Sequence, residues 1–124
     1  MESRDFIELV QATWVHWLNH LQDFPQIDCE ESTQSLTVVL PDQRVYLFNM
    51  HTGLQQLWLS SPFSGGRHFT YCKGKTGGNG FGPWNWHDTR NNEIIERVLN
   101  DEFKIHYGIA LHLTHINVPV HGEK

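Results

Sequence analysis

A single tryptophan is the residue whose place in the sequence most strongly predicts a binding function. It lies in the segment Gln55-Gln56-Leu57-Trp58-Leu59-Ser60-Ser61. In a strand that buries Leu57 and Leu59, the alternation of side chains turns Gln56, Trp58 and Ser60 to the opposite face. Exposed aromatic side chains on a rigid sheet are frequent anchors of binding interfaces. The alternative is that a glycine-rich loop or the end of the chain covers Trp58.

Two other predicted strands add polar side chains to the same face. His68 alternates with Phe69, and Asn49 points outward if Phe48 belongs to the core. The resulting surface is flat, aromatic and polar, which is typical of a protein interface rather than of a small-molecule pocket. An ordinary solvated sheet face is the alternative, and Trp58 is the residue that argues against it.

The nine histidines raise the possibility of a metal site, but their spacing gives little support. His16 and His20 stand four residues apart on one predicted helix. A zinc-protease motif needs glutamate directly after the first histidine, and Trp17 occupies that position. We therefore interpret His16 and His20 as histidines at the edge of the core.

Carboxylates are the other candidate metal ligands. Asp5, Glu8 and Asp23 lie on the outer face of the predicted first helix, and Asp28 and Glu30 lie on the strand that follows. Hard cations prefer such oxygen ligands. Carboxylates spread over an open surface bind cations weakly, so a solvated acidic edge is the alternative.

Sequence motifs for other chemistry are incomplete. The run Gly74-Lys75-Thr76 lacks the earlier glycine of a phosphate-binding loop, because Phe69 stands there. Neither Cys29 nor Cys72 has a base beside it in the sequence, and we expect Cys29 to be part of the core. Two cysteines are too few for a disulfide framework, which favours a reducing compartment.

Length and charge limit the remaining classes. With 124 residues, the chain is predicted to form one domain, numbered 1–124. The formal net charge is −5 and the basic residues are scattered, which argues against a nucleic-acid partner. No run of about 20 apolar residues is present, so we expect no membrane-spanning segment and no membrane partner.

The elements that position these residues follow from hydrophobic periodicity. A helix is predicted from Phe6 to Phe24, ended by Pro25, and a second helix over 94–103 with Gly108 as its C-cap. Period-two patterns predict five strands, at 27–31, 36–40, 45–48, 54–60 and 67–71. A flexible glycine-rich loop is expected over 73–83 and a C-terminal tail over 114–124. We predict an α+β two-layer sandwich, with both helices on one face of a mostly antiparallel sheet.

The segment Leu57-Trp58-Leu59-Ser60-Ser61-Pro62-x-Ser64-Gly65, followed by Phe69, resembles the frataxin/CyaY family. Asn49 precedes this segment at the family's spacing, and the strand at 27–30 and the first helix are also similar. The resemblance makes Trp84 the start of the last strand. It therefore implies five to six strands in the order α-β-β-β-β-β-β-α.

The resemblance also implies a function. Family members assist iron–sulfur cluster assembly by docking on a cysteine desulfurase and its scaffold protein, where they promote sulfur transfer. Iron binding, with ferroxidase or iron-chaperone and storage activity, is the alternative that the resemblance offers, and a non-catalytic regulator is the expectation that we favour. The partner-binding positions expected from the resemblance and the strand phase are Trp58, Asn49, His51, Gln56, Ser60, Arg67 and His68.

For iron, the resemblance identifies Asp23, Asp28 and Glu30 as the acidic positions that this chain retains. Asp5, Glu8, His16 and His20 are weaker candidates. Several acidic positions of the family's first helix are uncharged here, at Leu18, Asn19 and Gln22, so weak binding of Fe²⁺ or Fe³⁺ is expected. We expect a monomer in a mitochondrion or a mitochondrion-derived organelle, with the bacterial cytoplasm as the alternative.

Overall fold

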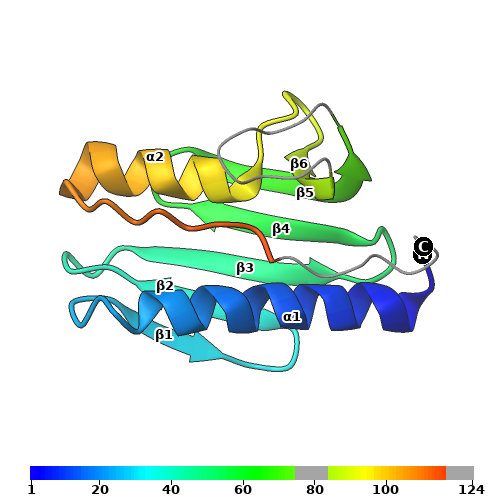
Figure 1. Ribbon diagram of the computed structural model, residues 1–124, viewed down its shortest axis with the longest axis horizontal. Coiled ribbons are helices and arrows are strands. Elements are labelled where there is room, and N and C mark those ends of the chain that lie inside the picture. Colours follow the sequence, from blue (N-terminus) through cyan, green and yellow to red (C-terminus); the bar gives the residue numbers. More distant parts are fainter. Residues whose placement is uncertain (75–83, 117–124) are drawn as a thin grey trace.

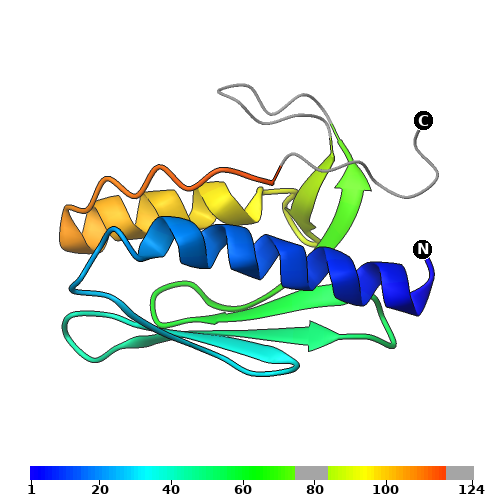
Figure 2. The same ribbon diagram turned by 60° about the horizontal axis from the view of Figure 1, so that its bottom comes forward.

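A computed structural model describes residues 1–74 and 84–116 of the chain. Within these ranges two helices pack on one face of a sheet of six antiparallel strands, which run side by side in chain order. Figure 1 shows α1 and α2 over the same face of the sheet, and Figure 2 shows the other face without a covering helix. The predicted α+β two-layer sandwich and its element order are confirmed.

The bounds of the elements follow the predicted periodicity closely. The helices are α1 (Ser3–Leu21) and α2 (Ile95–Tyr107). The strands are β1 (Asp28–Glu31), β2 (Ser35–Val39), β3 (Val45–His51), β4 (Gln56–Ser61), β5 (Gly65–Lys73) and β6 (Trp84–Asp88). Helix α1 ends before the predicted Phe24, which instead lies in the turn that precedes Pro25. Gly108 ends α2 in the left-handed conformation, with a φ of 66°, as predicted for a C-cap.

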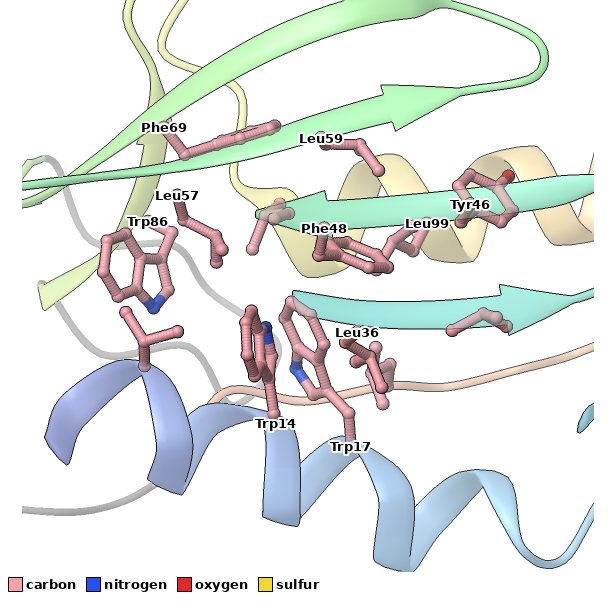
Figure 3. Close-up of a cluster of buried hydrophobic side chains, with 14 of the residues drawn as sticks. Trp14, Trp17, Leu36, Tyr46, Phe48, Leu57, Leu59, Phe69, Trp86 and Leu99 are labelled. Carbon is pink, nitrogen blue, oxygen red and sulfur yellow. The ribbon is translucent and has the colours of Figure 1, made fainter. Parts of the chain in front are cut away.

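The core lies between α1, α2 and the covered face of the sheet. Helix α1 contributes Trp14 and Trp17, which are 0% and 1% exposed, at positions four and seven residues after the buried Val10. Figure 3 shows both indoles directed at apolar side chains of the sheet, among them Phe48 and Leu57. The strands bury every second residue, so exposed and buried residues alternate along β3.

The segment after α2 packs back between the two helices (Figure 1). Leu111 and Leu113 are buried, and the Asn100 side chain holds the backbone of Leu113 through two hydrogen bonds. Ile116 is also buried, so the first residues of the predicted tail belong to the packed body. The remainder of that tail, 117–124, and most of the predicted glycine-rich loop, 75–83, lie outside the described residues.

A buried carboxylate lies inside this helical layer. Glu96 of α2 is 0% exposed and accepts a hydrogen bond of 3.1 Å from Trp17 Nε1. Its Oε2 is also 3.4 Å from Nδ1 of His115, whose Nε2 is 2.9 Å from the Tyr71 hydroxyl. These contacts connect α1, α2, β5 and the C-terminal segment through polar groups within the core.

Candidate protein-docking site

The open face of the sheet carries Trp58 at its centre. Trp58 lies on β4 opposite Asn49 of β3 and His68 of β5. Leu57 and Leu59 are 0% and 2% exposed on the covered face, which turns Trp58 outward in the predicted phase. The strand pattern therefore places the indole where the sequence analysis expected it.

Trp58 is stacked between two imidazole rings rather than fully exposed. The His68 ring is nearly parallel to the indole, with centroids 4.1 Å apart and an interplanar angle of 6°. The His51 ring has its centroid 4.4 Å from that of the indole. The indole N–H donates a hydrogen bond of 2.8 Å to Gln56 Oε1. These contacts leave Trp58 half-buried and hold it in one orientation.

His51 is itself fixed by the turn between β3 and β4. Its Nδ1 accepts a hydrogen bond of 3.1 Å from the backbone N–H of Leu54. Gln55 completes the turn in the left-handed region, with a φ of 52°. An imidazole fixed by the backbone in this way gives Trp58 a rigid neighbour, and a pre-organised anchor loses less conformational entropy on binding.

Apolar side chains extend the open face beyond Trp58. Val45 and Leu47 of β3 are 40% and 36% exposed and share this face with Asn49. Ser60 of β4 is exposed and pairs with Leu47. The surface that we call the Trp58 face comprises Val45, Leu47, Asn49, His51, Gln56, Trp58, Ser60 and His68. Its aromatic, apolar and polar side chains match the composition of protein interfaces.

Arg67 does not belong to the Trp58 face, and the prediction that placed it among the partner-binding residues is corrected here. It precedes His68 on β5, so its side chain points to the covered face, where it is 8% exposed. Its Nε donates a hydrogen bond of 2.9 Å to the Asp88 carboxylate, and it also pairs with Glu93. The register of β5 therefore makes Arg67 structural.

Asp88 is the buried partner of that arginine. Burial alone would raise the pKa of the Asp88 carboxyl, but hydrogen bonds from the Arg90 backbone and from Arg67 outweigh it, so the pKa lies below its usual value. The two hydrogen bonds measure 2.8 Å and 2.9 Å. This ion pair fastens β5 to the end of β6.

The second serine of the Ser-Ser motif is also structural. Ser61 Oγ accepts hydrogen bonds of 3.0 Å from the backbone N–H groups of Phe63 and Ser64, which shapes the β4–β5 turn. Its hydroxyl donates to Glu102 of α2 at 2.7 Å, and the Tyr46 hydroxyl donates to the same carboxylate at 2.9 Å. The motif therefore joins the exposed Ser60 to a turn that is anchored on the helical layer.

The predicted metal ligands are not brought together. Asp23, Asp28 and Glu30 are exposed, Asp23 in the turn after α1 and the other two on the edge strand β1. Within residues 1–74 and 84–116, no three side chains of histidine, cysteine, aspartate or glutamate are grouped to hold a metal ion. Of the weaker candidates, Asp5 and Glu8 lie near the start of α1.

His16 and His20 contact the C-terminal segment instead of each other. His16 Nε2 is 3.3 Å from the Thr114 hydroxyl, and His20 is hydrogen-bonded to the Leu111 carbonyl. Their interpretation as histidines at the edge of the core agrees with these contacts.

Both cysteines differ from expectation. Cys29 is exposed rather than part of the core, because β1 is an edge strand. Cys72 has an imidazole next to it in space, since His87 Nδ1 lies 3.3 Å from its Sγ. The two residues belong to neighbouring strands, so only the pairing of β5 with β6 reveals the contact.

Comparison with known proteins identifies the family to which this chain and its fold belong. A model of the frataxin-like domain, Frataxin_Cyay, matches residues 1–109. The chain therefore belongs to the frataxin/CyaY family, as the resemblance implied.

Individual relatives agree with this membership. The iron–sulfur cluster assembly protein CyaY of Neisseria meningitidis serogroup C is 26% identical over 117 residues, which is 94% of this chain and 99% of that protein. The mitochondrial frataxin homolog of Schizosaccharomyces pombe is 31% identical over 77 residues, which is 61% of this chain and 43% of the yeast protein. The relatives include a mitochondrial frataxin homolog and a bacterial CyaY, which is consistent with either alternative of the predicted localisation.

Solved structures of the family show the same fold. The frataxin of Psychromonas ingrahamii gives a TM-score of 0.73 at 19% identity, covering 89% of this chain and 95% of its own. Trimeric frataxin from Saccharomyces cerevisiae, whose structure is described as complexed with ferrous, gives a TM-score of 0.61 at 26% identity. The match covers 77% of this chain and 81% of the yeast chain.

Neither helix in the described parts of this chain is long and apolar enough to cross a membrane.

Proposed function

We propose that this chain is an assembly factor for iron–sulfur clusters that docks its Trp58 face on a complex of a cysteine desulfurase and its scaffold protein, and thereby promotes sulfur transfer. The observation that carries the proposal is the half-buried Trp58, stacked between His51 and His68 on a sheet face that neither of the two described helices covers. The relatives named CyaY, an iron–sulfur cluster assembly protein, support the choice of pathway.

The physics of the surface fits a regulator better than an enzyme. The side chains that surround Trp58 directly are imidazoles and neutral amides, which suit recognition of another protein surface. The rigid indole offers a large apolar area whose orientation is fixed before binding, so most of its contact energy contributes to affinity. The chain would act on the desulfurase complex by binding to its surface, without catalysing a reaction itself.

Loss of the anchor tests this proposal. Trp58→Ala is expected to weaken binding to the desulfurase–scaffold complex at least about tenfold, since a central aromatic anchor contributes about 2 kcal/mol or more. Isothermal titration measures the affinity, and circular dichroism verifies that the variant is folded. Ile105→Ala is the matched control, because Ile105 is 74% exposed on α2, in the helical layer. Equal affinity of the Trp58→Ala variant and the unaltered chain would refute the proposal.

Iron, as a cargo of the pathway, is expected to bind this chain weakly. The carboxylates of Asp23, Asp28 and Glu30 are exposed and spread over two elements, so few charges converge on any one cation. A calorimetric titration with Fe²⁺ is expected to show no binding below about millimolar concentration. Tight binding that is abolished in the Asp23→Asn and Asp28→Asn variants would instead support the ferroxidase or chaperone function.

A further inference from the structure

Cys72 and His87 form a thiol–imidazole pair on the side of β5 and β6 that faces away from the helices, beyond the Trp58 face. The Sγ of Cys72 lies 3.3 Å from Nδ1 of His87. In the register of β5 and β6, Thr70 pairs with His87 and Cys72 pairs with Asn85, so the pair is diagonal across the two strands. Cys72 is half-buried, and His87 is 7% exposed.

Packing orients the imidazole. A Cβ atom added at Gly74 would lie 2.8 Å from His87 Nε2 and 3.1 Å from its Cε1. The backbone after β5 therefore packs directly against the ring, and only glycine leaves room for it. An activated thiol can be identified in a structure by two features: a base within hydrogen-bond reach of the sulfur, and a further group that holds this base in place. Cys72, His87 and the backbone at Gly74 show both features.

The two cysteines of the chain have different surroundings. Burial raises the pKa of the Cys72 thiol, so its sulfur keeps its proton at neutral pH until a base accepts it. His87 Nδ1 is placed to accept that proton. For Cys29, although the residue as a whole is exposed, desolvation of the thiol and then the neighbouring Asp28 carboxylate raise the pKa to about 11. The neighbour of Cys29 thus opposes formation of the thiolate, whereas the neighbour of Cys72 assists it.

We propose that Cys72 accepts sulfane sulfur from a persulfide group of a docked partner, with His87 as the base. Cys72 Sγ attacks the outer sulfur of the donor R–S–SH, and a new S–S bond forms while the S–S bond of the donor breaks. His87 takes the proton of Cys72, and the departing thiolate of the donor takes a proton. Cys72 becomes a persulfide, Cys–S–SH, and the donor is reduced to the thiol R–SH.

The position of Cys72 connects this pair with the docking surface. Cys72 follows His68 by four residues on the same face of β5, which corresponds to about 13 Å along the strand. A protein that covers Trp58 and His68 therefore extends toward Cys72. The inference rests on the proposed function to this extent, because the desulfurase would supply the donor persulfide.

The first experiment uses the purified chain and glutathione persulfide, without any partner. After timed quenching with an alkylating reagent, peptide mass spectrometry measures the gain of one sulfur atom at each cysteine. Cys72 is expected to gain sulfur at least about tenfold faster than Cys29, which is the internal control. Equal rates at the two cysteines, or a faster rate at Cys29, would overturn the proposal.

Two variants test the role of the base. His87→Gln keeps a polar side chain of similar length without a basic nitrogen, and Gly74→Ala retains both reacting residues but displaces the ring. Each is expected to lower the sulfur gain of Cys72 at least about tenfold while the rate at Cys29 stays unchanged. Circular dichroism verifies that both variants are folded. Unchanged loading of Cys72 in folded His87→Gln would contradict the assignment of His87.

A second experiment separates this inference from the proposed function. The persulfide-loaded desulfurase with its scaffold replaces glutathione persulfide, and loading of Cys72 is expected in the unaltered chain and not in Trp58→Ala. If the complex binds but Cys72 receives sulfur from neither donor, the sulfur-acceptor proposal fails and the docking proposal stands. If glutathione persulfide loads Cys72 but the complex does not bind, the docking proposal fails and the acceptor assignment stands.

Discussion

The two faces of the sheet hold polar side chains in opposite ways, and two neighbouring residues of β5 show the difference. Arg67 points to the covered face, where it is paired with the buried Asp88. His68 points to the open face, where it stacks on Trp58 and is exposed. A step of one residue along a strand therefore separates a structural ion pair from the proposed docking surface.

The comparison teaches that carboxylates and an arginine hold elements together on the covered face, whereas the described side chains that contact Trp58 on the open face are two imidazoles and an amide. Glu96 and Asp88 are both 0% exposed and are hydrogen-bonded to side chains of other elements. Around Trp58 the contacts are ring stacking and one hydrogen bond, which the indole N–H donates to Gln56. Substitutions on the covered face should therefore affect folding first, and substitutions on the open face should affect docking first.

The largest effect is expected for Asp88→Ala. Removal of this carboxylate leaves Arg67 without its fully buried partner, and breaking a buried ion pair costs about 3 kcal/mol or more of the free energy of unfolding. Urea denaturation followed by circular dichroism measures this loss. Docking of the folded variant on the desulfurase complex should stay within about twofold of the unaltered chain. A loss of less than about 1 kcal/mol would show that the ion pair is not structural.

Much of the fold follows from the sequence, because each element buries one face with a regular period. The helix with Trp14 and Trp17 and the strand with Leu57 and Leu59 were predictable in type and phase. Alternation also shows that Trp58 faces away from the buried leucines. The covered position of Arg67 follows from the same alternation, and the prediction missed it because Arg67 was included from the family resemblance, as the neighbour of His68, and not from its strand phase.

Other features depend on contacts between distant parts of the chain. The stack of His51 on Trp58 needs the register of β3 and β4, and the pair of Cys72 and His87 needs the register of β5 and β6. Periodicity within one strand does not determine which residues of two strands lie opposite each other. The burial of Glu96 was predictable from the sequence, because Glu96 stands three residues before the buried Leu99 on the apolar stripe of α2.

A smaller effect is expected for His68→Ala on the open face. Loss of one stacked ring frees the Trp58 indole and removes about 0.5–1.5 kcal/mol of aromatic contact. Binding to the desulfurase complex should weaken by a few-fold, and the free energy of unfolding should change by less than about 1.5 kcal/mol. Titration calorimetry and urea denaturation measure the two quantities. A larger loss of stability than of affinity would mean that the stack serves folding rather than docking.

The smallest effect concerns stability in acid. The pKa of Asp88 is lowered in the folded chain, so its contribution to stability is present above the unfolded pKa, roughly 3.9, and is lost as pH falls through the folded value. Urea denaturation of the unaltered chain and Asp88→Asn between pH 7 and pH 3 tests this expectation. The stability difference between them should shrink below about pH 4. A constant difference across this range would show that the carboxylate is not the group responsible.

The most direct measurement follows the indole N–H signals of the chain by ¹⁵N–¹H NMR during titration with the desulfurase–scaffold complex. Trp58 is half-buried on the open face, whereas Trp14, Trp17 and Trp86 are buried in the core. The docking account predicts early shift or broadening of the Trp58 signal, with the amides of Asn49 and His68, before the core indoles respond. Perturbation confined to α1 and α2, with the Trp58 signal unchanged at saturation, would contradict it.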